Sequence, residues 1–114
     1  MLIEINDLRK TFINGTKALQ GVNFSVKKGE FVVILGASGS GKTTLLRSIN
    51  GLVDCENGEI KFQGSILSSS SLPALRKQTG MVFQDFNLVN NLSAINNVLT
   101  GLLDSSNTLM SMLY

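Results

Sequence analysis

Residues 31–49 read FVVILGASGSGKTTLLRSI. Phe31 to Leu35 form a continuous apolar run, which is typical of a strand buried on both faces of a parallel sheet. After the glycines, Leu45, Leu46 and Ile49 recur at helical spacing, and Gly51 is a plausible helix stop. The segment therefore predicts a buried strand, a glycine-rich loop and an amphipathic helix, in that order.

The loop matches the pattern G-x-x-x-x-G-K-[ST] at Gly36, Gly41, Lys42 and Thr43. Glycines let the backbone curl so that several N–H groups face an anion, and the N-terminus of the next helix adds a positive dipole end. In this pattern Lys42 reaches the β- and γ-phosphates, and the Thr43 hydroxyl coordinates Mg²⁺. The alternative is a glycine-rich surface turn whose lysine is only solvated.

The rest of the chain predicts further elements on both sides of this loop. Alternating apolar and polar residues at 3–6 and 22–27 indicate half-buried antiparallel strands, with turns at Asn14-Gly15 and Lys28-Gly29. A short strand is expected at 59–62, a polar loop at 65–71, a helix at 73–77 and a second buried strand at 80–84. From Ser93, a possible N-cap, one helical face collects the apolar residues Ile95, Val98, Leu99, Leu102 and Leu103.

Composition narrows the classes of protein. The 114 residues carry a formal net charge of +2, which does not suggest a nucleic-acid or membrane-surface protein. The chain has no histidine, which excludes an imidazole base or ligand, and its single cysteine excludes an internal disulfide framework. No signal peptide is evident, and the apolar run at 31–35 is too short to span a membrane. We therefore expect a soluble cytoplasmic chain.

Several segments together resemble the nucleotide-binding domain of ABC transporters, the ATP-binding subunit of that family. The resemblance implies an α/β P-loop NTPase fold of ABC type. The resemblance further implies that this fold is truncated in the chain, to an antiparallel β-subdomain, the start of the α/β core and the start of the helical subdomain. The segments that carry it are LRKTF at 8–12, ALQGVNF at 18–24, KGE at 28–30, the loop, LLRSINGL at 45–52, NGEI at 57–60, and MVFQ at 81–84 with Asn87-Leu88.

The same resemblance divides the chain. It implies β-subdomain strands at 1–30, the phosphate-loop unit at 31–52, a return to the β-subdomain with the glutamine loop at 53–92, and the start of the helical subdomain at 93–114. It also implies ATP and Mg²⁺ as ligands, with Phe12 stacking on adenine. The implied phosphate contacts come from Ser38, Gly39, Ser40, Gly41, Lys42, Thr43 and Thr44.

Gln84 matches the glutamine-loop residue of the family, whose amide oxygen reaches Mg²⁺ and the attacking water. The implied catalytic residues are Lys42 and Gln84, and the implied metal ligands are Thr43 and Gln84. The implied partners are a transmembrane permease and, in the full-length family, a second ATPase subunit, with no nucleic acid. The implied location is the inner face of the cell membrane. Residues 97–101 (NVLTG) look more particularly like phosphonate importers.

The sequence also departs from the family pattern. It contains no Leu-Ser-Gly-Gly-Gln signature, no apolar strand ending in the acidic pair that organises Mg²⁺ and water, and no switch histidine. Asp85 is expected to be an ordinary loop carboxylate. The uncharged, apolar end at 105–114 suggests that the natural unit continues. We therefore expect ATP binding with little or no hydrolysis, and marginal stability of the isolated chain.

Two other functions stay open at this point. One is a truncated, non-catalytic module that binds nucleotide or docks on a permease. The other is a different phosphate-loop enzyme, such as a small-molecule kinase, which the ordered matches on both sides of the loop disfavour.

Overall fold

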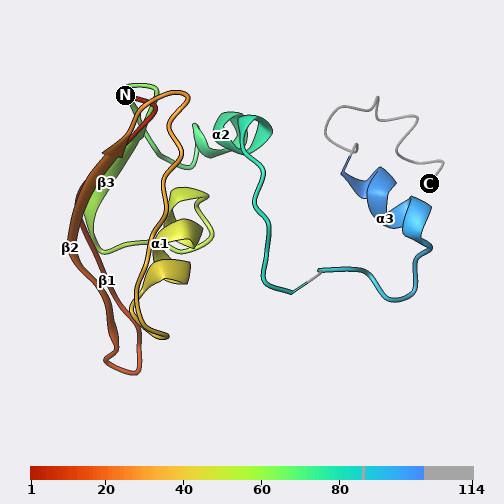
Figure 1. Ribbon diagram of the computed structural model, residues 1–114, viewed down its shortest axis with the longest axis horizontal. Helices are drawn as coiled ribbons and strands as arrows, with labels where there is room; N and C mark the ends of the chain where they lie inside the picture. The colour runs from red at the N-terminus through yellow and green to blue at the C-terminus, as the bar shows by residue number, and fades with distance from the viewer. Residues whose placement is uncertain (86, 102–114) are drawn as a thin grey trace. The chain divides into compact units, whose positions relative to one another are not determined.

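The computed structural model describes residues 1–85 and 87–101, and the chain divides into two units, Met1–Met81 and Val82–Tyr114. The first unit holds strands β1 (Ile3–Thr11), β2 (Lys17–Val26), β3 (Asn57–Phe62) and β4 (Ser65–Ile66) with helices α1 (Lys42–Ile49) and α2 (Leu72–Gln78) (Figure 1). The second unit holds α3 (Ala94–Thr100).

The strands form one antiparallel sheet in the order β2-β1-β3-β4. The predicted antiparallel pairing is confirmed, and the predicted turn at Asn14-Gly15 joins β1 to β2, with Gly15 at φ +86°. A two-residue turn, Gln63-Gly64, joins β3 to β4 with both residues at positive φ, as a type I′ hairpin requires. The polar loop expected at 65–71 therefore begins with a short strand.

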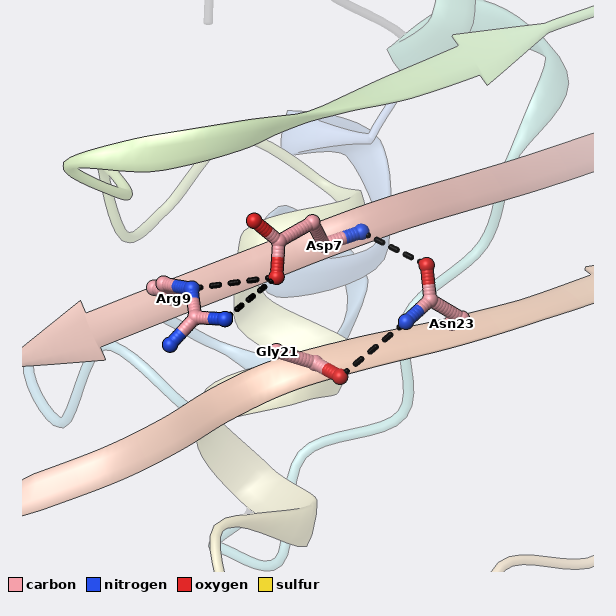
Figure 2. A network of polar contacts seen from close by, with 4 residues as sticks. All are labelled: Asp7, Arg9, Gly21 and Asn23. Atoms are coloured by element: carbon pink, nitrogen blue, oxygen red, sulfur yellow. Dashed lines mark hydrogen bonds and ion pairs between the residues drawn. The ribbon is translucent and has the colours of Figure 1, made fainter.

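A bulge in β1 decides which residues enter the core. Asp7 has φ +45°, and the register of β1 against β2 shifts between Ile5 and Leu8. The extra residue breaks the period of two, so that Ile5 and Leu8 are both buried. Figure 2 shows the polar contacts that hold it: the Asp7 N–H donates to Asn23 Oδ1 at 2.8 Å, and Arg9 donates to Asp7 Oδ1 through Nε and Nη2 at 3.0 and 2.7 Å.

The core lies between one face of the sheet and α1. Ile5, Leu8 and Leu19 from the sheet meet Leu45 of α1, and Ile34 and Ile49 pack against them. Figure 1 shows α1 beside the sheet, with the connection from β2 passing next to it. This packing confirms the predicted amphipathic helix and fixes the position of the loop that precedes it.

The two strands predicted as buried, at 31–35 and 80–84, are absent from the described residues, and both predictions are wrong. Residues 31–37 belong to no strand, and Phe31 and Leu35 are 91% and 87% exposed. Val82 is likewise exposed. An apolar run forms a strand only when neighbouring strands satisfy its backbone, and within 1–85 and 87–101 none pairs with either segment.

In the second unit, the predicted N-cap of α3 is confirmed, because Ser93 Oγ accepts from the Asn96 N–H at 3.2 Å. The Asn97 side chain fastens the preceding loop by accepting from the Val89 N–H at 2.9 Å. Two of the apolar residues that the sequence collects on one face of this helix, Ile95 and Val98, are exposed. Leu102, Leu103 and residues 105–114 lie outside the described residues. Along the described chain, no helix has the length and apolarity needed to cross a bilayer.

We expect the chain by itself to be marginally stable, with a broad thermal transition centred below about 50 °C. Few of the described side chains are fully buried, while the large apolar residues Phe31, Val32, Val33 and Leu35 meet solvent. Far-UV circular dichroism during heating, without nucleotide, measures this. A sharp cooperative transition well above that temperature would contradict the expectation.

Candidate functional site

The candidate site is the loop at 36–41, which leads directly into α1. The Ser40 N–H donates to the Ala37 carbonyl at 3.1 Å, which closes a turn containing Gly39 at φ +76°. Gly41 follows at φ +95° and is the N-cap residue of α1. Left-handed backbone at these positions suits glycine, so the loop takes a curled path that other residues would strain. Ser38, Gly39 and Ser40 are exposed on it.

The loop backbone packs against strand β2. A Cβ atom on Gly41 would overlap the Ala18 carbonyl oxygen, so the loop backbone lies directly against β2. Leu19, the residue after Ala18, belongs to the core cluster together with Leu45 of α1. The two segments that meet here, β2 and the start of α1, are therefore both anchored in the core. The sheet thus fixes the position of the loop relative to α1.

The Lys42 side chain folds back over the loop. Its Nζ donates to the carbonyl oxygens of Gly36 and Ala37 at 2.6 and 2.7 Å and to Ser40 Oγ at 3.1 Å. The ammonium is therefore held at the mouth of the loop by groups that a phosphate oxygen can replace. Thr43 is exposed on the first turn of α1, and Thr44 is half-buried there.

The far end of α1 is fixed by α2. Arg76 donates to the carbonyl oxygens of Asn50 and Gly51 at 3.2 and 3.1 Å; Asn50 is the C-cap residue, whose carbonyl the helix leaves unpaired. Gly51 has φ +68° and packs against the Leu72 side chain, so the predicted helix stop at Gly51 is confirmed. With both ends held, α1 presents its N-terminus to the loop in a fixed direction.

Phe12 stands at the tip of the β1–β2 hairpin, where its N–H donates to the Thr16 carbonyl at 2.9 Å. Phe12 is 38% exposed. Thr11 pairs with Lys17, the residue before Ala18, and Ala18 touches the loop. Because only Lys17 lies between the hairpin turn and Ala18, the tip of the hairpin is close to the phosphate loop.

A carboxylate ties the segment after α1 to this same strand end. The Thr11 N–H donates to both oxygens of Glu56, at 2.9 Å to Oε2 and 3.2 Å to Oε1. Lys10 Nζ lies 3.3 Å from Glu56 Oε1 and 5.5 Å from the centroid of the Phe12 ring. The hydrogen bond from the Thr11 N–H, with a smaller contribution from Lys10, lowers the pKa of Glu56 from its ordinary value of 4.5.

This pKa shift predicts that acid lowers the stability of the hairpin end that Glu56 holds. A carboxyl whose pKa is lower in the folded than in the unfolded state adds stability above its unfolded pKa and loses it as pH falls through the folded value. We expect NMR titration of the Glu56 carboxyl to give a midpoint below 4.5. We also expect Glu56→Gln to melt below the parent chain near neutral pH and to converge with it in acid. A midpoint at or above 4.5 would overturn this prediction.

The residues present fit a magnesium nucleotide. The loop offers curled backbone, the Lys42 ammonium and the N-terminus of an eight-residue helix. No cluster of three acidic, histidine or cysteine side chains exists in the part of the chain that the structure covers. A Mg²⁺ bound at this loop would be held by the Thr43 hydroxyl, which is exposed on the first turn of α1, and would neutralise phosphate charge.

The predicted site residues fall into both units. Phe12, the residues at 38–41, Lys42, Thr43 and Thr44 belong to the first unit, and Gln84 to the second, where it is exposed in a bend. The role of Gln84 at Mg²⁺ stays a prediction, as do the other assigned roles.

Sequence reasoning missed Lys10 and Glu56. Lys10 could have been found, since it precedes Phe12 by two residues where β1 ends, and residues two apart in extended backbone share a face. The contact of Glu56 with β1 depends on the fold and has no local signal.

Comparison with known proteins agrees with this geometry. A family model described as ABC transporter matches residues 19–113. The chain is 47% identical over 103 residues to the phosphonates import ATP-binding protein PhnC of Lactobacillus gasseri, covering 88% of this chain and 40% of that protein. It is 44% identical over 115 residues to the protein of the same name from Shouchella clausii, covering 98% and 43%. The chain thus spans less than half the length of these curated relatives.

Solved structures give the same result for the fold. An ATP-binding cassette in a dimeric, post-hydrolysis state bound to ADP and Pi superposes with a TM-score of 0.81 at 36% identity, covering 92% of this chain and 48% of that one. A part of the cbiONQ ABC transporter complex from Clostridium perfringens superposes with a TM-score of 0.75 at 31% identity, covering 96% and 45%.

Proposed function

The chain belongs to the ABC transporter family, and from that membership we propose that it is the ATP-binding portion of a transport ATPase subunit of the phosphonate-import type. The observation that carries this proposal is the Lys42 ammonium held across the mouth of a glycine loop that opens α1. That arrangement suits a polyphosphate, because it combines one cation with backbone N–H groups at a helix N-terminus.

Each residue has a distinct part in the proposed site. Lys42 moves its hydrogen bonds from the loop carbonyls to the β- and γ-phosphates, and the N–H groups at 38–41 contact the phosphates from the loop. Thr43 holds Mg²⁺, and Phe12 stacks on adenine beside the loop. From the family resemblance we also propose that Gln84 is a metal ligand and that it senses the permease. Support for a permease and a second ATPase subunit as partners comes from relatives: one solved relative is dimeric, and another is part of a transporter complex.

We propose little or no hydrolysis by the chain as given. Its sequence carries neither the signature motif nor histidine. This favours, as a second candidate, a module that binds nucleotide or docks on a permease without turnover. In either case the proposed location is the cytoplasmic face of a membrane, reached through the permease.

Calorimetric titration of the 114-residue chain with Mg-ATP, followed by an assay for released phosphate, tests the proposal. We expect saturable binding of one nucleotide per chain and phosphate release no faster than in buffer. Failure to bind Mg-ATP while the chain is folded would overturn the proposal. Turnover abolished by a change at the phosphate loop would overturn the expectation of little hydrolysis.

A further inference from the structure

We propose that Lys10 is a positioning residue for the base of the bound nucleotide: held by Glu56, its ammonium group fixes the Phe12 ring on which the base stacks. This inference rests on the proposed function and adds to it two residues outside the phosphate loop.

The first observation is how Lys10 is held. Lysine normally keeps its ammonium in water while its alkyl stem lies on the protein. Here the side chain is only 19% exposed, and Nζ lies between Glu56 Oε1 at 3.3 Å and the Phe12 ring, whose centroid is 5.5 Å away. The cation therefore has a defined place, over the ring.

The second observation is that Glu56 is itself held. Its carboxylate accepts from the Thr11 N–H with both oxygens, and its own N–H donates to the Arg9 carbonyl at 3.2 Å. Glu56 thus bonds to the strand residues on both sides of Lys10. The ammonium is attached to a carboxylate that cannot easily swing away, so the cation and the ring form a preorganised pair.

The third observation is where the bulge puts these residues. Because the bulge at Asp7 shifts the alternation of β1, Lys10 follows Leu8 on the side of the strand that faces the core and α1. The contact between Lys10 and Phe12 keeps the ring near that same side.

These positions suit a base-stacking platform. The faces of an aromatic ring carry negative charge and attract a cation within about 6 Å. A cation over one face holds the ring and draws electron density from it, which reduces repulsion against a purine stacked on the ring. Phe12 is 38% exposed, so a ligand can reach it. A ring that is already oriented also loses less freedom when the base binds.

The experiment compares two ligands on the full chain at low temperature: Mg-ATP, and inorganic tripolyphosphate with Mg²⁺, which lacks a base. We expect Lys10→Met to weaken Mg-ATP binding about two- to fivefold and to leave tripolyphosphate binding unchanged. Phe12→Ala should weaken Mg-ATP binding about five- to 150-fold. In the Phe12→Ala background, Lys10→Met should have no further effect on Mg-ATP binding. In the parent chain, Lys10→Arg keeps a cation and should therefore retain most of the affinity for Mg-ATP.

A matched control comes from the chain itself. Lys61 and Glu59 form the same kind of ion pair, at 3.1 Å, on β3, where Lys61 lies at the opposite end from the Phe12 hairpin. Lys61→Met removes the same charge and should leave both ligands unaffected. If Lys10→Met does not fold, Glu56→Gln serves instead, because the amide oxygen still accepts from Thr11 while the ammonium loses its partner.

Three results would overturn the inference. One is equal weakening of both ligands by Lys10→Met, which means a general charge effect. Another is the same loss with and without Phe12, and the third is no loss at all. If the parent chain binds neither ligand, the proposed function fails and this inference fails with it. If it binds both but the Lys10 variants match Lys61→Met, only this inference fails.

Discussion

Gly41→Ala is expected to destabilise the chain by ~3 kcal/mol or more, and to abolish nucleotide binding with it. Gly41 has φ +95°, where an alanine is strained, and its Cβ would overlap the Ala18 carbonyl oxygen. That oxygen belongs to the backbone of β2 and cannot rotate away as a side chain can. Net stability is commonly ~5–15 kcal/mol, and we expect this marginal chain to lie below that range, so that the substitution leaves most of it unfolded.

Gly39→Ala is the matched control, because Gly39 lies in the same loop at φ +76° with no atom within 4 Å of an added Cβ. It imposes backbone strain without overlap and should cost ~1 kcal/mol. Urea unfolding at low temperature measures both variants. Equal midpoints for Gly39→Ala and Gly41→Ala would show that the contact between loop and β2 does not support the site.

The parts of the fold that could be predicted from sequence are those with a local cause. Asn14-Gly15 allows the positive φ of a tight turn, and Leu45 with Ile49 marks one face of α1. The phosphate loop was also recognisable, because Gly39 and Gly41 occupy backbone conformations that other residues avoid.

The parts that could not be predicted depend on distant partners. The run at 31–35 has the composition of a buried strand, yet a strand exists only where another strand accepts its hydrogen bonds. The bulge at Asp7 needs Asn23 from β2 to bind its N–H, and Glu56 reaches Thr11 across 45 residues of chain. Composition reports which residues prefer burial, whereas these contacts depend on which segments meet.

Lys42→Ala is expected to weaken Mg-ATP binding about 10- to 150-fold, the effect of a charge-assisted hydrogen bond worth ~1.5–3 kcal/mol. The ammonium already lies at the loop mouth, where it donates to the Gly36 and Ala37 carbonyls. In contrast to Gly41→Ala, the fold should survive, because these loop residues are exposed and water can replace the lysine. We therefore expect the thermal midpoint to change little while affinity falls.

Two variants separate the position of the charge from its presence. Lys28→Ala removes the same charge from an exposed turn and should bind Mg-ATP as the parent does. Lys42→Arg keeps a cation but replaces a compact ammonium with a planar guanidinium, so we expect only partial affinity. Tripolyphosphate should lose affinity in step with ATP, because Lys42 acts on phosphates and not on the base. If Lys42→Ala and Lys28→Ala bind Mg-ATP equally well, the lysine at the loop is an ordinary solvated side chain, and the nucleotide assignment loses the observation that carries it.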